Sequence, residues 1–197
     1  LVPVLKSYWL TIHVSVITAS YGFLGLSAML GFITLIFIIV LGLLSNEKIK
    51  EQIVTNIKEG TRINQISMIV GLTLLIIGNF LGGVWANESW GRYWGWDPKE
   101  SWTLITVVIY AAIVHLPYIP RMNNDYVINS VALLGYSTVI MTYFGVNYYL
   151  SGLHSYAAGD PIPIPTWLYV TTTFICSLVL IAFFFRNGPK QYKTEKL

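Results

Sequence analysis

Residues 21–44 have the sequence YGFLGLSAMLGFITLIFIIVLGLL, and this stretch decides the fold class. It contains no charged residue. A helix needs about 20 consecutive apolar residues to cross the roughly 30 Å hydrocarbon core of a bilayer. The stretch meets that length, so it predicts a membrane-spanning helix.

Four further apolar runs of bilayer length follow along the chain. Together they predict an all-α integral membrane bundle of about five transmembrane helices, at residues 21–44, 66–84, 102–116, 127–149 and 167–185. The chain is 55% hydrophobic and 11% charged, with a mean hydropathy of +0.62, which a water-soluble domain of this size could not solvate. We expect one membrane domain over residues 1–185 and a basic tail over 186–197. The start at Leu1 without Met suggests a piece of a longer chain.

The first apolar segment is longer than one crossing requires. A helix over residues 3–44 would measure about 63 Å, twice the hydrocarbon core. We therefore expect residues 8–20 to form a helical extension at the outer face, either in the membrane interface or standing above it. Gly22 and Gly25 are candidate bend points between this extension and the first span.

The basic residues predict the orientation, because Lys and Arg are enriched on the cytoplasmic side of membrane proteins. Nine of the twelve fall in loops 45–62 and 117–126 or in the tail, and only Lys6, Arg92 and Lys99 lie elsewhere. We therefore expect the C-terminus to be cytoplasmic, and the N-terminus, the loop 85–101 and the loop 150–166 to be outside. The basic residues form no stripe of the kind that nucleic-acid binding needs.

Residues 85–102, with the sequence WANESWGRYWGWDPKESW, hold five of the seven tryptophans. An aromatic belt at the membrane interface would spread tryptophans over all the helix ends. Here they are concentrated in one outer loop together with Gly91 and Gly95, which leaves room for a flat partner to approach the backbone. Asp97 and Pro98 also predict the start of a helix, as its N-cap and first-turn residues.

This loop resembles a known signature. The stretch WGRYWGWDPKE at residues 90–100 resembles the WWD motif of haem-handling membrane proteins, and its ending resembles the CcsA type of cytochrome c biogenesis protein, also called ResC, more than the CcmF or CcmC types. The resemblance extends from His13 to about Tyr169. It implies that haem b lies against the loop on the outer face, with contacts from Trp85, Trp90, Trp94, Trp96, Asp97 and Trp102. It also implies that His13 and His154, which flank the loop in sequence, are the axial ligands of the haem iron.

The chain has three histidines, and each lies at or near a predicted membrane boundary. Ionisable residues in such places mark functional sites by default. Haem iron can take two axial nitrogens from opposite ring faces, so two outer histidines beside an aromatic platform are sufficient. Taken singly, His13 could instead be a polar residue of an interfacial helix, and His154 an ordinary loop residue. Arg92 or Lys99 could neutralise the haem propionates or simply solvate the loop.

His115 lies eighteen residues after Asp97, which is about 27 Å along a helix and therefore near the inner face. It could be an interfacial residue that reaches towards water, a single axial ligand, or one ligand of a pair. The resemblance favours the pair, in which His115 binds an inner haem iron. Its partner histidine would come from a CcsB-type (ResB-type) protein, fused or separate.

Two smaller features carry weaker expectations. Gly78 and Gly82 form a pair of small residues, which we expect to pack spans two and three closely. Cys176 is the only cysteine, so this chain can form neither a disulfide within itself nor a thiol-based metal cluster.

The resemblance implies a holocytochrome c synthase in the bacterial cytoplasmic membrane or the thylakoid membrane. Such a protein delivers haem across the membrane and presents it for thioether attachment to the CxxCH motif of apocytochrome c. Alternatives are a haem exporter of the CcmC type without the covalent step, a CcmF-type haem lyase subunit, and a di-haem electron-transfer subunit. The tryptophan loop and the odd number of histidines argue against the last. Neither a phosphate-binding glycine loop nor a Ser-His-Asp order supports ATP-driven transport or hydrolysis.

Overall fold

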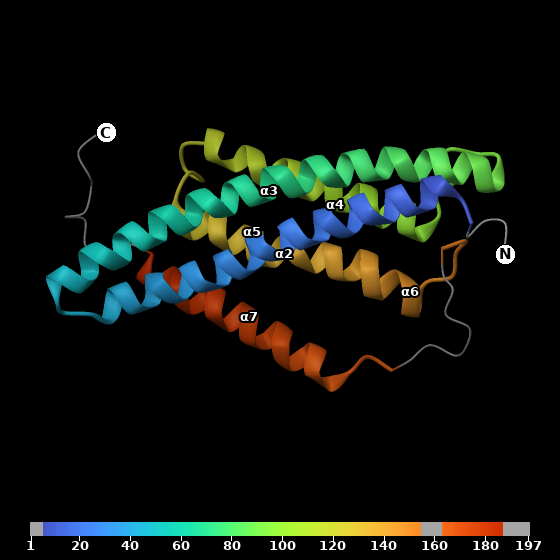
Figure 1. Ribbon diagram of the computed structural model, residues 1–197. Helices are drawn as coiled ribbons and strands as arrows, with labels where there is room; N and C mark the ends of the chain where they lie inside the picture. The colour runs from blue at the N-terminus through green and yellow to red at the C-terminus, as the bar shows by residue number, and fades with distance from the viewer. Residues whose placement is uncertain (1–5, 155–162, 187–197) are drawn as a thin grey trace.

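The computed structural model describes residues 6–154 and 163–186, and every regular element within them is helical (Figure 1). Five helical segments are long and apolar enough to cross a membrane, which confirms the predicted all-α membrane bundle. These segments are α2 (Tyr8–Leu43), α3 (Glu47–Trp90), α4 (Pro98–His115) with the 3-10 turn η1 (Leu116–Tyr118), α5 (Asp125–Ile140) with the π-helix η2 (Met141–Gly145) and α6 (Val146–Tyr149), and α7 (Thr166–Phe185).

The first helix, α2, is continuous over 36 residues, so the expected helical extension over 8–20 and the first span are one helix that is not interrupted at Gly22 or Gly25. The 36 residues of α2 extend about 54 Å at 1.5 Å per residue. Gly25 serves packing instead, since a Cβ there would lie 3.1 Å from the hydroxyl of Tyr136. The helix begins after Ser7, whose side chain accepts a hydrogen bond from the backbone N–H of Trp9.

The second helix is longer than predicted at both ends, and its 44 residues extend about 66 Å. The expected loop 45–62 is wrong, because α3 starts at Glu47. Asn46 caps it by accepting from the N–H groups of Lys48 and Ile49, and the residues that follow are mostly good helix formers. The basic residues of this segment therefore lie on a helix.

The expected loop 85–101 is also wrong in its bounds. Helix α3 continues to Trp90 and ends at Gly91, which takes the left-handed conformation with φ 68°. Helix α4 then starts at Pro98, as predicted, with Asp97 as its N-cap and Glu100 completing a capping box. The loop between them is residues 91–97. Trp85 and Trp90 belong to α3, and Trp102 belongs to α4.

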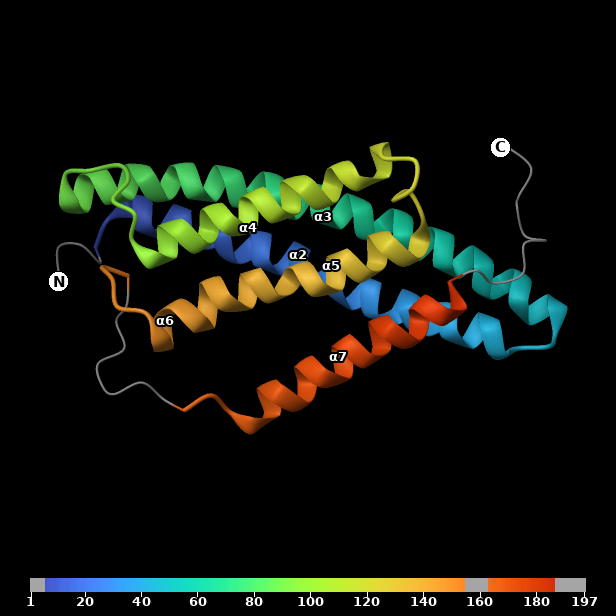
Figure 2. The ribbon, with the colours of Figure 1, turned by 180° about the vertical axis from the view of Figure 1, so that it is seen from behind.

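Helices α2 and α3 run antiparallel side by side as a long hairpin, and the other helices pack along it (Figures 1 and 2). We call the end with Trp90 and the loop 91–97 the tryptophan end, and the other the opposite end. Small residues of α3 allow close approach to α2, since Gly78 lies against Ile17 and Gly82 against His13. The expectation that these two glycines pack spans two and three is therefore wrong, because the helix facing them is the first.

A hydrogen-bonded polar chain joins α2, α3 and α5 inside the bundle. The Ser27 hydroxyl donates to Asn64, the Asn64 amide donates to Asn129 at 2.7 Å, and the Asn129 amide donates to Thr61 at 2.8 Å. All four side chains are buried. Because lipid offers no hydrogen-bond partners, these contacts fix the three helices in one register.

Candidate functional site

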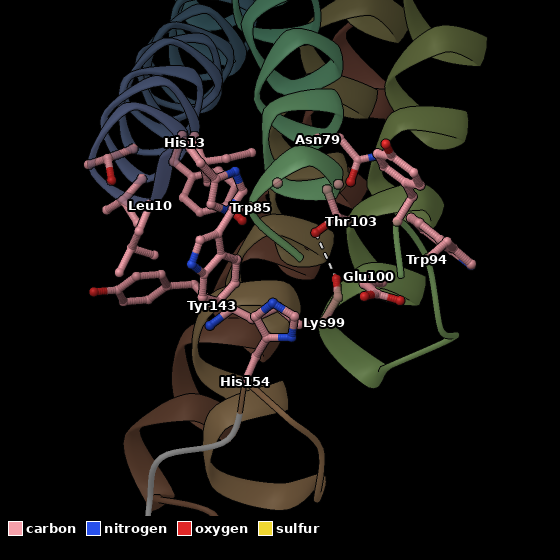
Figure 3. A pocket seen from close by; sticks show the side chains of 17 residues that line it. Leu10, His13, Asn79, Trp85, Trp94, Lys99, Glu100, Thr103, Tyr143 and His154 are labelled. Carbon is pink, nitrogen blue, oxygen red and sulfur yellow. Dashed lines mark hydrogen bonds between the residues drawn. The ribbon is translucent and has the colours of Figure 1, made fainter. Parts of the chain in front are cut away.

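A cavity of about 190 Å³ opens at the tryptophan end, between α2, α3, α4 and η2 (Figure 3). Its wall is largely apolar and aromatic, with a few polar groups converging on it. The residues that line it are Leu10, His13, Val14, Ile17, Thr18, Tyr21, Asn79, Gly82, Gly83, Trp85, Tyr93, Trp94, Lys99, Glu100, Thr103, Tyr143 and His154. The two histidines predicted as haem ligands therefore lie in one cavity, although they are far apart in sequence.

The imidazole of His13 is held by α3. Its Nδ1 lies 2.8 Å from the carbonyl oxygen of Gly78, and since a carbonyl can only accept, Nδ1 carries the proton. The ring lies directly over Gly82, where a Cβ would be 2.7 Å from its Cε1. The absence of a side chain at residue 82 thus makes room for the imidazole. The Nε2 lone pair is left for a metal.

The imidazole of His154 is held by the N-cap of α4. Its Nδ1 donates to Oδ2 of Asp97 at 2.9 Å, while Oδ1 of the same carboxylate accepts from the backbone N–H of Leu153 at 2.6 Å. The Asp97 side chain is only 3% exposed. A carboxylate on one ring nitrogen orients a histidine and strengthens the other nitrogen as a metal ligand. Asp97 is therefore placed to position His154, and it also caps α4.

Two tryptophans of α3 lie against these histidines. The indole of Trp85, which is fully buried, stacks on His13 with ring centroids 6.1 Å apart and meets His154 edge-on at 5.4 Å (Figure 3). Trp90 packs edge-on against Trp85 at 4.8 Å and against His154 at 5.1 Å. The two imidazoles and the two indoles therefore form one aromatic cluster.

The other tryptophans of the motif fall into different environments. Trp94 lines the cavity, whereas Trp96 is 73% exposed and takes a left-handed backbone with φ 59°. Glu100 enforces this shape, because its Oε2 accepts from the N–H groups on both sides of Trp96, those of Gly95 at 2.8 Å and Asp97 at 3.1 Å. Trp102 does not line the cavity. Of the five tryptophans between residues 85 and 102, Trp85 and Trp94 thus line the cavity, whereas Trp90, Trp96 and Trp102 do not.

The two basic residues that could neutralise haem propionates, Arg92 and Lys99, lie in different environments. Arg92 lies 3.4 Å from the Glu100 carboxylate and over the ring of Trp90. Lys99 lines the cavity and donates to the side-chain oxygen of Asn147, a neutral acceptor, at 2.9 Å. Lys99 is therefore the basic side chain that lines the cavity, whereas Arg92 is paired with a carboxylate.

The π-helix η2 completes the wall, and the sequence had not indicated it. It places Tyr143 in the cavity, while the hydroxyl of Thr142 lies 3.1 Å from that of Thr106 and 3.2 Å from the carbonyl oxygen of Trp102. Short π-helical turns of this kind often occur at functional sites. No sequence signal marks them, and the same holds for the cavity residues Tyr21, Asn79 and Thr103.

His115 lies apart from the cavity. It ends α4 at the opposite end of the bundle, where it is exposed, donates from Nδ1 to the carbonyl oxygen of Ala111 at 2.6 Å, and lies beside Tyr118. Within residues 6–154 and 163–186, no group of three or more His, Cys, Asp or Glu side chains could hold a bare metal ion. At the tryptophan end, two imidazoles whose Nδ1 atoms bond protein oxygens lie in an aromatic pocket with one basic side chain, and this set of residues fits a haem instead.

Comparison with known proteins identifies the family of this chain. The family model described as cytochrome C assembly protein matches residues 1–154. The chain is 53% identical to protein NrfI of Wolinella succinogenes over 93% of its own length, which is 20% of that protein. It is 36% identical to the cytochrome c biogenesis protein CcsA of Guillardia theta and to that of Prochlorococcus marinus strain MIT 9301, in each case over 79% of its own length.

The chain spans 56% of the length of those two CcsA proteins. The family match covers more than half of the chain, and it includes both histidines of the cavity and the whole tryptophan motif. The resemblance to CcsA-type proteins is therefore confirmed, and the chain belongs to the cytochrome c assembly protein family.

Proposed function

We propose that the cavity at the tryptophan end holds haem b between His13 and His154 and presents it to apocytochrome c for covalent attachment. The observation that carries the proposal is the hydrogen bonding of the two imidazoles. Each uses Nδ1 to bond a protein oxygen, and each therefore leaves Nε2 as the ligating atom in the same cavity. Two such nitrogens satisfy the axial positions of a low-spin haem.

The protein's own part in the reaction is to orient the haem ligands and to exclude water from the site. Asp97 and the Gly78 carbonyl hold the two imidazoles in position, and Trp85 and Trp90 exclude water around them. Lys99 is the cation placed to hold a propionate. Haem supplies the vinyl groups, and each thiol of the CxxCH segment adds its sulfur and its hydrogen across one vinyl double bond. Because the addition consumes no oxidant or reductant, correct placement is the main requirement.

This function makes the full-length protein a holocytochrome c synthase or its haem-binding subunit. A haem exporter of the CcmC type would hold haem in the same way but would form no thioether bond. The two are separated by co-expressing the chain with an apocytochrome c and a CcsB-type partner, fused or separate, and testing the cytochrome for haem that survives acid-acetone extraction.

The experiment that tests the site uses His13→Ala and His154→Ala in the same system. Each variant should lose part of its haem, lose the low-spin spectrum of what remains, and mature less cytochrome. Added imidazole should restore the low-spin spectrum, because the substitution leaves space at the iron. If both variants keep wild-type spectra and haem content, the ligand assignment is wrong.

His115 belongs to a second part of the proposal. We propose that it is one ligand of an entry site on the cytoplasmic side, whose other histidine comes from the CcsB-type partner. His115→Ala should then deplete haem from both sites, whereas His13→Ala should deplete mainly the outer one. If His115→Ala keeps all of its outer-site haem, His115 is not a haem ligand but an interfacial residue that points towards water.

A further inference from the structure

A second cavity, of about 220 Å³, lies at the opposite end of the bundle, between α3 and the start of α5. Its wall is mostly polar, unlike that of the haem cavity. The residues that line it are Lys58, Thr61, Arg62, Gln65, Asn123, Asn124, Asp125 and Ile128. None of them belongs to the tryptophan motif or lines the first cavity.

The position of this cavity across the bilayer follows from the length of α4. With η1 it forms a segment of 21 residues, Pro98–Tyr118, which extends about 31 Å and matches the hydrocarbon core of a bilayer. Pro98 therefore lies near one membrane surface and Tyr118 near the other. The residues from Asn123 to Asp125 begin five positions after Tyr118, so the cavity lies at the level of the lipid headgroups.

The charges that line the cavity favour a singly charged anion. Lys58 and Arg62 lie one helical turn apart on α3, and Asp125 contributes one carboxylate, so the formal charge of the lining is +1. A phosphodiester carries a single negative charge and balances this lining. The amides of Gln65 and Asn123 add hydrogen-bonding groups beside the cations.

The walls of the cavity are held rigidly. Thr61 is the end of the buried polar chain, where it accepts from Asn129 and fixes α3 against α5. Asn124 closes the other side, because its Oδ1 accepts from the N–H of Val127 at 2.9 Å and its amide donates to the Arg121 carbonyl oxygen. A cavity that is already formed costs its ligand little ordering free energy.

We propose that this cavity binds the phosphodiester headgroup of an anionic membrane lipid. Basic pockets between transmembrane helices at the cytoplasmic surface favour such headgroups, and the orientation predicted from the basic residues places this end of the bundle there. The lipid ties α3 to the start of α5 where the helices leave the bilayer. This site is independent of haem.

The test measures lipid retention by native mass spectrometry of the purified chain, with phosphatidylglycerol and phosphatidylcholine as the probes. Phosphatidylglycerol should be retained in preference to the zwitterionic lipid. Arg62→Gln and Lys58→Gln should each weaken its binding about fivefold, which corresponds to ~1 kcal/mol per basic residue. The matched control is Lys48→Gln, which removes the same charge from an exposed position of α3 outside the cavity and should change binding less than twofold.

Two outcomes would overturn the proposal. One is an equal loss of binding in Lys48→Gln and Arg62→Gln, because it would mean that only the overall charge of this end matters. The other is binding of inorganic phosphate that depends on Arg62 and is not accompanied by any preference for phosphatidylglycerol, because it would assign the cavity to a soluble phosphate. Thermal unfolding of each variant in detergent checks that the bundle is intact.

Discussion

His154 donates from Nδ1 to the carboxylate of Asp97 at 2.9 Å, and this contact joins the segment that follows α6 to the N-cap of α4. The same carboxylate accepts from the backbone N–H groups of Lys99 and Leu153. One acidic residue therefore starts a transmembrane helix, closes the chain back onto it and orients a candidate haem ligand.

Asp97→Asn separates these roles. Asparagine is as good an N-cap as aspartate, so α4 should form and the stability of the bundle should change little. The amide has only one oxygen and no charge, so it cannot serve His154 and Leu153 together. Haem affinity should fall by about 10- to 100-fold, the usual effect of losing a residue that orients a metal ligand. Haem titration followed by absorbance measures this.

The control for this variant is Asn46→Asp, an exchange at the N-cap of α3, which lies far from the haem cavity. It should leave haem affinity unchanged. Unaltered haem binding in Asp97→Asn would show that the carboxylate acts on the helix alone.

Gly82→Ala tests the contact that places His13. The added methyl group would lie 2.7 Å from Cε1 of the imidazole, so the ring must move and lose its bond to the Gly78 carbonyl. We expect loss of the low-spin haem spectrum with an intact bundle, because alanine is the better helix former by about 1 kcal/mol. Absorbance spectra and thermal unfolding of the purified variant measure the two effects.

Gly22→Ala is the matched comparison, because it makes the same change on α2 where no atom lies within 4 Å of the new methyl group. It should keep the wild-type spectrum. Equal spectra for the two alanine variants would contradict the role of Gly82.

Two tryptophans of the motif should differ sharply in their effect on stability. Trp85 is fully buried, so Trp85→Ala should destabilise the protein by about 3–5 kcal/mol. Trp96 is 73% exposed with a left-handed backbone, so Trp96→Gly should be neutral or stabilising by up to about 1 kcal/mol. Thermal unfolding in detergent compares them, and a large loss of stability in Trp96→Gly would be inconsistent with the described loop.

The orientation can be tested with two exposed serines. In a Cys176→Ser background, Ser151→Cys at the tryptophan end should react with a membrane-impermeant thiol reagent in intact cells, whereas Ser45→Cys in the turn before α3 should not. Both should react once the cells are permeabilised. Labelling of only Ser45→Cys in intact cells would show that the orientation is the reverse of the predicted one, with the candidate haem cavity on the cytoplasmic side.

The sequence by itself determined the features that depend on local composition. Bilayer thickness dictates the length of an apolar run, so residues 21–44 and their four counterparts predicted the five spans. Asp97 and Pro98 predicted the start of α4 because capping is local. The tryptophan motif and the histidines identified the candidate haem residues, although the sequence could not say which tryptophans face the cavity.

Only the tertiary structure decided how these residues meet. The bonds from His13 to Gly78 and from His154 to Asp97 join residues 65 and 57 positions apart, and no local pattern encodes such pairs. The continuity of α2 through Gly22 and Gly25 depends on packing, since Gly25 lies against Tyr136, and the glycines of α3 face the first helix for the same reason. The π-helix that places Tyr143 in the cavity likewise has no signature in composition or periodicity. These features arise because side chains of separate helices must fill common space and satisfy each other's hydrogen bonds where lipid offers none.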